Sequence, residues 1–140
     1  MNEAFKECLK SRKIIPFPRA KRLVNKELAA AEDDLAEAKD RLKHSKHKYA
    51  TINSYYSIFH AARALLYSQG YRERSHRCLS IALEALFVGT GKMTIHSIRI
   101  FKNSMSLREN ADYSSSFSKE SALLGITNAQ DFLKTARSLL

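Results

Sequence analysis

Glycine and proline are scarce in this sequence. Its 140 residues include four glycines and two prolines, whereas average usage of the two would be roughly 12% of a chain. An all-β fold would need many more turns than these residues can supply. Ala and Leu (17 and 16 residues) outnumber Ile and Val (nine and two), and the first pair favours helices whereas the β-branched pair favours strands. The composition therefore predicts an all-α protein, and the length fits one domain.

Cysteine is scarce as well. Cys8 and Cys78 lie far apart and without C-x-x-C spacing, so the sequence suggests neither a zinc site nor a disulfide framework, and a reducing cytoplasm fits. No apolar run approaches the roughly 18 residues that a membrane span requires. The first ten residues mix charged and apolar side chains, unlike a signal peptide. We expect a cytoplasmic protein that does not contact a membrane.

Common catalytic motifs are also missing. The sequence contains no Walker loop, no G-x-G-x-x-G, no H-E-x-x-H and no nucleophile elbow. His44 and His47 lie three residues apart, as two metal ligands could, but no third ligand is evident. We therefore expect no metal site and no cofactor.

Apolar spacing divides the chain into helices. A short helix over 2–12 is followed by an extended break at Pro16 and Pro18, so we expect residues 1–18 to be a lead-in and 19–140 a single domain. Further helices are expected at about 19–46, 48–69, 78–88, 94–112 and 118–140. Two of these carry apolar residues at alternating spacings of three and four: Val24, Leu28, Ala31, Leu35, Ala38 and Leu42 in one, and Ala122, Ile126, Ala129, Leu133, Ala136 and Leu140 in the other. This spacing is typical of helices packed at a shallow angle and predicts an up-and-down bundle of four to five main helices.

The helix over 48–69 gathers its polar side chains on one side. At 100° per residue they fall within an arc of about 120°: Asn53, Tyr56, Ser57, His60, Arg63 and Tyr67. Such an arc is either the solvent face of the helix or a face that lines a ligand site, and both interpretations stay open here.

The helix over 94–112 carries a charged pair where core residues are expected. Its apolar stripe consists of Ile98, Phe101 and Met105. The same spacing continues to Arg108 and Asp112, which form either an internal ion pair or part of an open groove. Because burying an ion pair carries a desolvation penalty, we expect the groove.

Positive charge is concentrated near the N-terminus of a chain whose formal net charge is +10. The stretch over 10–26 holds seven basic residues and no acidic one: Lys10, Arg12, Lys13, Arg19, Lys21, Arg22 and Lys26. This basic patch could attract phosphates or an acidic partner, or it could be a solvated helix end. Phe17 is the one aromatic residue inside it, so no stacking platform for single-stranded nucleic acid is evident.

Three segments together resemble a known family. INSYYSIFHAARALLYSQGYRERSH begins at Ile52, LFVGTGK at Leu86 and LRENADY at Leu107. They resemble the HEPN domain (higher eukaryotes and prokaryotes nucleotide-binding) in its small stand-alone prokaryotic form, over about 19–140. The resemblance implies a helical bundle, frequent homodimers and frequent pairing with a minimal nucleotidyltransferase in toxin–antitoxin-like modules.

The resemblance also bears on catalysis. Active members of the family are metal-independent ribonucleases that use an Arg, four to six intervening residues and a His near a dimer cleft. Arg108 matches the Arg, but positions 113–115 hold no His. Tyr113 stands at the first of them, and a phenol is a poor base at neutral pH. Arg41 and His47 have the required spacing on an earlier helix, which we interpret as a chance match.

We therefore expect a non-enzymatic HEPN-like binding protein, a homodimer that binds a minimal nucleotidyltransferase, a nucleotide or RNA. The expected ligand- or partner-binding residues are Arg108, Asp112, Tyr113, Tyr56, His60 and Arg63. Arg108 would contact phosphate or acidic groups through its planar fork of donors, Asp112 would orient it, and the others would line the groove. The alternatives are a ribonuclease with a degenerate motif and a basic helical nucleic-acid binder that uses the stretch over 10–26.

Overall fold

The computed structural model describes residues 2–140 and confirms the all-α fold class. The described residues form six α-helices: α1 (Glu3–Lys10), α2 (Val24–Lys43), α3 (His47–Ser68), α4 (His76–Leu83), α5 (Ile95–Tyr113) and α6 (Lys119–Leu139). The other elements are two short strands, β1 (Ile14–Pro16) and β2 (Tyr71–Glu73), a 3₁₀ helix η1 (Pro18–Leu23) and a π-helical turn η2 (Glu84–Val88) that continues α4. None of the described helices has the combined length and apolar character that crossing a bilayer requires.

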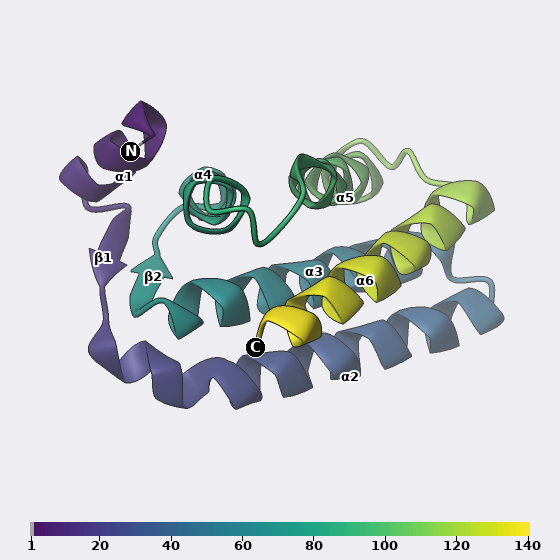
Figure 1. Cartoon of the computed structure of the whole chain (residues 1–140). Coiled ribbons are helices and arrows are strands. Elements are labelled where there is room, and N and C mark those ends of the chain that lie inside the picture. Colours follow the sequence, from purple (N-terminus) through teal and green to yellow (C-terminus); the bar gives the residue numbers. More distant parts are fainter. Residues whose placement is uncertain (1) are drawn as a thin grey trace.

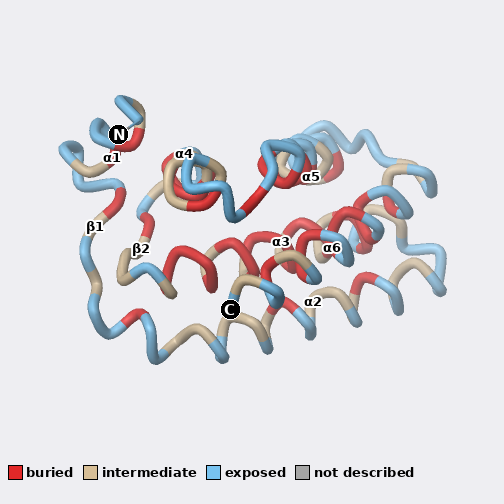
Figure 2. The backbone as a smooth tube through the Cα atoms, viewed as in Figure 1, coloured by how far each residue is buried: buried red, intermediate tan, exposed pale blue. Residues whose placement is uncertain are grey.

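Helix α3 lies at the centre of the molecule. In Figure 1, α2, α3 and α6 run lengthwise side by side, whereas α4 and α5 are seen almost end-on and so cross that layer. Helix α2 runs antiparallel to α3. Helix α6 runs in the same direction as α3, because the crossing helix α5 separates the two in the sequence and returns the chain to the end of the bundle where α3 begins. Figure 2 shows α3 buried along most of its length, as its largely apolar sequence predicts.

Small residues let α6 approach α3 closely. A Cβ atom added at Gly125 would lie 3.2 Å from Cβ of Ser54, so the two backbones meet at this point. The predicted apolar series of α6 is buried from Ala122 to Ala136, while Leu140 lies beyond the helix and is exposed. In α2 the two alanines of the series, Ala31 and Ala38, are buried and its larger members are half-buried.

The helices begin and end close to the expected residues, with one main difference. Gly70 adopts a φ of +81° just after α3, and the Ser118 side chain caps α6; glycine and serine are the residue types that favour these two positions. The helix expected from residue 19 begins as the 3₁₀ turn η1, with Pro18 at its first position, and becomes α-helical at Val24.

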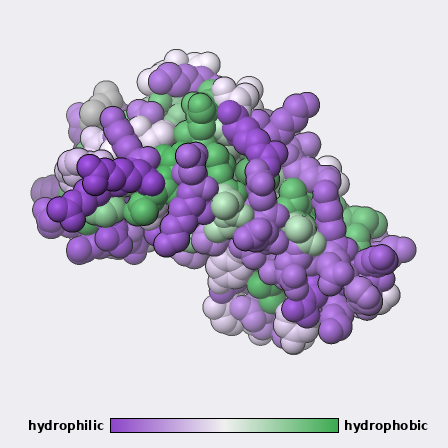
Figure 3. Space-filling model, turned by 90° about the horizontal axis from the view of Figure 1, so that it is seen from below, coloured by the Kyte–Doolittle hydropathy of each residue, from purple (hydrophilic) through white to green (hydrophobic). Residues whose placement is uncertain are grey.

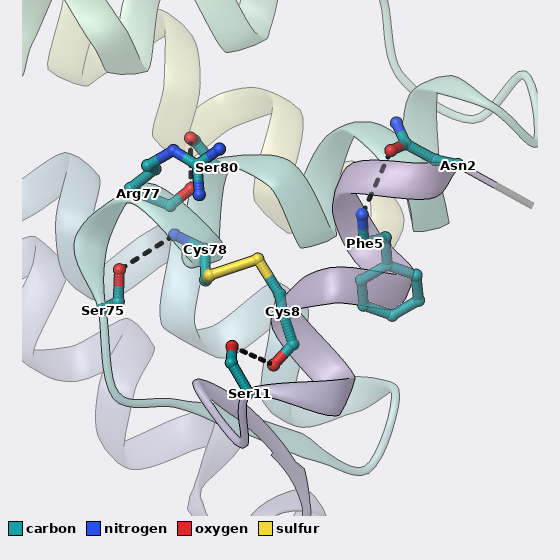
Figure 4. The surroundings of a disulfide bond; sticks show 8 residues. All are labelled: Asn2, Phe5, Cys8, Ser11, Ser75, Arg77, Cys78 and Ser80. Atoms are coloured by element: carbon teal, nitrogen blue, oxygen red, sulfur yellow. Dashed lines mark hydrogen bonds between the residues drawn. A yellow bond between two sulfur atoms is a disulfide. The ribbon is translucent and has the colours of Figure 1, made fainter.

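Cys8 and Cys78 form a disulfide, so the expectation that the cysteines form none is wrong. Strands β1 and β2 pair antiparallel, with Ile14 opposite Glu73. Because β1 follows α1 and β2 precedes α4, this pairing brings the two helices together, and the Cα atoms of the two cysteines lie 5.8 Å apart (Figure 4). The location in the cytoplasm stays a prediction, now without support from the cysteines.

Candidate functional site

Arg108 lies among three tyrosine rings. Its Cζ atom is 5.7 Å from the ring centroids of Tyr55 and Tyr56 on α3, and 5.2 Å from that of Tyr113 at the end of α5. These separations are within the range of cation–π attraction. The guanidinium also donates a hydrogen bond of 3.3 Å to the Tyr56 hydroxyl, and one of its nitrogens lies 3.5 Å from Oδ2 of Asp112. These five residues are called the Arg108 cluster below.

The apolar stripe of α5 explains how Arg108 reaches this position. Ile98 and Phe101 are buried and Met105 is half-buried, so this side of α5 packs on the bundle and carries Arg108 toward α3. The Arg108 side chain keeps 18% of its surface exposed, and Asp112 keeps 36%. The pair is therefore neither deeply buried nor fully open.

The Arg108 guanidinium is held in place, but not all of its hydrogen-bond donors have a partner among the described residues. Its Nε atom is buried and has no hydrogen-bond partner among the described residues. Asp112 is its one carboxylate contact within ion-pair distance in the described chain. Tyr113, with 73% of its surface exposed, borders the guanidinium on the solvent side. The cluster thus presents a positive charge, framed by aromatic rings, near the surface.

His76 joins the cluster from α4. Its Nδ1 atom lies 2.7 Å from the Tyr55 hydroxyl, and its ring centroid lies 4.7 Å from that of Phe59. Burial and the nearby charge of Arg108 lower the pKa of His76 below its usual value, although Glu73 acts to raise it. His76 was not among the site residues expected from the sequence. A signal was present, because the first segment that resembles HEPN ends on this histidine.

His60 and Arg63 lie apart from the Arg108 cluster, in a charged network between α3, α2 and β2. The His60 Nδ1 atom is 2.6 Å from Oε2 of Glu27, and the Arg63 Nε atom donates to Glu73 at 3.3 Å. Burial acts to raise the pKa of Glu27, but the hydrogen bond from His60 and the charge of Arg63 outweigh it and lower that pKa. These contacts indicate a role in joining α2 to α3.

The polar arc of α3 was expected to be either a solvent face or a face that lines a ligand site. The structure shows a third use of these side chains, which is to join α3 to neighbouring elements. Its members bond to α2 as well as to α5: the Ser57 hydroxyl donates to the Ala31 carbonyl at 2.7 Å, and the Asn53 amide donates to Asp34 at 3.3 Å. Of the arc, Tyr56 is the member that contacts Arg108.

The seven residues of the basic patch are all exposed and extend from the end of α1 to the start of α2. Figure 3 views the molecule from below Figure 1, the side on which η1 and α2 lie, and shows a mostly hydrophilic surface. A surface cavity of about 520 Å³ lies nearby, with Lys21, Val24, Ser68 and Leu140 among its lining residues. It includes no member of the Arg108 cluster, so the groove expected beside Arg108 is not this cavity.

Of the two histidines weighed as metal ligands, His44 contacts its own helix through its ring and His47 through its backbone carbonyl. His44 Nδ1 lies 2.9 Å from the Asp40 carbonyl oxygen, and the His47 carbonyl accepts a bond from Thr51. Within residues 2–140, no three His, Cys, Asp or Glu side chains are grouped so that they could hold a metal ion.

Comparison with known proteins identifies the family. The profile described as "HEPN domain" matches residues 24–140. A protein of Methanocaldococcus jannaschii named "Putative toxin MJ0605" is 32% identical over 83 residues, which are 59% of this chain and 62% of the relative. The match thus spans less than two thirds of that relative's length. Because the family profile covers most of the chain, including the Arg108 cluster, this protein belongs to the HEPN domain family.

Proposed function

We propose that this chain is a non-enzymatic HEPN protein that binds phosphate groups of a nucleotide or RNA at the Arg108 cluster. The observation that carries the proposal is the state of Arg108: three tyrosine rings hold the guanidinium in place, while one partly exposed carboxylate is its ion-pair partner. A guanidinium fixed in this way has little conformational freedom left to lose on binding. It can offer two parallel N–H donors to phosphate oxygens.

Asp112 has a supporting role in this proposal. At 3.5 Å from the guanidinium it orients the Arg108 side chain without forming a bidentate ion pair with it. Its 36% exposure lets water solvate the carboxylate when a phosphate draws the guanidinium away. The Tyr56 hydroxyl accepts a hydrogen bond from the same Nη2 atom that faces Asp112. The exposed Tyr113 ring offers a surface on which a base could stack.

The biological setting is a toxin–antitoxin-like module in this proposal, with a minimal nucleotidyltransferase as the partner and a homodimer as the working form. The relative named as a toxin supports the setting, and the HEPN resemblance supports the partner and the dimer. Co-expression with a nucleotidyltransferase encoded beside this chain should yield a complex on affinity purification. Light scattering of the purified chain should give the mass of a dimer.

Equilibrium binding of AMP and of a short RNA tests the site itself. Arg108→Ala should weaken binding about tenfold or more, because a hydrogen bond to a charged group contributes roughly 1.5–3 kcal/mol. Arg99→Ala is the matched control, since Arg99 is an exposed arginine of the same helix, and it should bind as the wild type does. Equal binding by both variants would refute the assignment of the site.

A ribonuclease is the second candidate, and one observation favours it: His76 bonds to Tyr55, whose ring also contacts Arg108. Incubation of the pure protein with RNA in EDTA separates the two functions. We expect no cleavage, because the segment after Arg108 lacks the histidine, and loss of a positioned acid or base costs roughly 10²–10⁴ in rate. EDTA-resistant cleavage that disappears in both Arg108→Ala and His76→Gln would overturn the non-enzymatic proposal.

A further inference from the structure

We propose that His76 is a second ligand-binding residue of the Arg108 cluster, and that His76 and Arg108 together bind a terminal phosphate group, that is, a phosphate monoester. This inference rests on the proposed binding function and makes it more specific. It names a residue from another helix and a class of ligand.

Tyr55 connects the two side chains. Tyr55 keeps 1% of its residue surface exposed, so it is a fixed support in the core. The Arg108 guanidinium lies 5.7 Å from the ring centroid of Tyr55, and the His76 ring centroid lies 6.0 Å from it. One rigid residue in the core therefore positions a permanent cation from α5 and a titratable imidazole from α4.

The hydrogen bond to Tyr55 leaves one nitrogen of His76 available. Burial raises the pKa of Tyr55 well above its usual value, so its hydroxyl keeps its proton and can donate it to Nδ1 of His76 at 2.7 Å. None of the hydrogen bonds among the described residues uses Nε2 of His76. Because His76 as a whole is exposed, Nε2 can donate to a ligand that arrives from solvent.

The charges that face His76 are nearly balanced. Four charged groups act on it from three elements packed nearby: Arg63 of α3, Glu73 of β2, and Arg108 and Glu109 of α5. Two are positive and two are negative, while burial disfavours the charged imidazole, so the ring is neutral at neutral pH. An anion with two charges would tip this balance, and His76 would take up a proton from solvent at Nδ1 as the anion binds. The Tyr55 hydroxyl would then turn so that its oxygen accepts from Nδ1–H.

Two features favour a terminal phosphate over an internal one. A phosphate monoester carries a charge of about −1.5 to −2 at pH 7, which matches one guanidinium and one newly protonated imidazole, whereas an internal diester carries a single charge. The Arg108 side chain is also recessed, with 18% exposed between Tyr56 and Tyr113. The end of a ligand can reach such a group more readily than the middle of a chain.

Calorimetric titrations between pH 6.5 and 8.5 test the inference with four probes: inorganic phosphate, AMP, and one short RNA with either a 5′-phosphate or a 5′-hydroxyl. The wild type should bind AMP and the 5′-phosphate RNA with an affinity that falls by up to about tenfold per pH unit above about pH 7, where these monoesters are already dianions, as uptake of one proton requires. His76→Gln should remove this dependence. His96→Gln, the control at an exposed histidine of α5, should keep it.

The outcomes distinguish this inference from the function on which it rests. If Arg108→Ala abolishes binding while His76→Gln keeps both the affinity and the pH profile of the wild type, the role of His76 is refuted and the proposed function stands. Equal binding of the 5′-hydroxyl and 5′-phosphate RNAs would refute the terminal phosphate. If the wild type binds none of the probes, the proposed function itself fails. Tighter binding of AMP than of the 5′-phosphate RNA would support a free nucleotide as the source of the phosphate, and the reverse would support an RNA end.

Discussion

Arg108 shows how a charged residue can continue an apolar stripe without forming a buried ion pair. The aliphatic stem follows the stripe of α5, and the guanidinium packs against tyrosine rings. Its stabilising contacts are therefore largely aromatic, and Asp112 stays in contact with water.

Replacing Arg108 with Ala should consequently cost little stability. We expect a loss of about 1 kcal/mol in urea unfolding, the size of a partly exposed cation–π contact. Asp112 would remain solvated, so no buried charge would be stranded. A loss of roughly 3–5 kcal/mol, which is typical of a broken buried pair, would instead place Arg108 and Asp112 in the core.

Glu27 should contribute stability that depends on pH. Its pKa is lowered in the folded state, so its contribution is complete above the unfolded pKa, which is about 4.3, and is lost as the pH falls through the folded pKa. Glu27→Gln should therefore unfold at lower urea concentration at pH 7 and show a shallower loss of stability on acidification. Glu32→Gln, at an exposed position of α2, is the control; identical pH profiles for the two variants would contradict the account of the His60 contact.

Among the elements, the disulfide between α1 and α4 has the largest expected effect on stability. It links two residues that lie 70 positions apart in the chain. Such a bond restricts the unfolded chain and thereby stabilises the folded protein by roughly 2–4 kcal/mol. Cys8→Ala/Cys78→Ala should lose about that much in urea unfolding. Reductant should lower the wild type to the level of the variant and leave the variant unchanged. A wild type that is indifferent to reductant would contradict the bond.

Contacts between elements are also where sequence reasoning failed. Periodicity orders side chains around one helix axis, but it does not say which neighbour covers a given arc. This is why His60 and Arg63 were grouped with Arg108, whereas α2 and β2 hold them instead. The disulfide and the position of His76 depend on the pairing of two three-residue strands, which are too short to leave an alternating pattern in the sequence.

For the whole molecule, sequence reasoning succeeded where local rules apply. The scarcity of Gly and Pro and the apolar spacing of α2 and α6 predicted the helical fold, and most expected helix ranges lie close to the observed ones. Arg108, Asp112, Tyr56 and Tyr113 were predicted as one site and do lie together. Their function as a site stays a prediction, as does the role of the basic patch, since both concern a ligand.

Ligand binding at the Arg108 cluster can be tested most directly by an NMR titration of the ¹⁵N-labelled chain with AMP. The largest shift changes should fall on the residues around Arg108, Tyr56 and Tyr113, and they should disappear in Arg108→Ala but persist in Arg99→Ala. Changes confined to the basic patch over 10–26, with the Arg108 cluster unmoved, would refute the site at Arg108 and assign binding to the N-terminal charge.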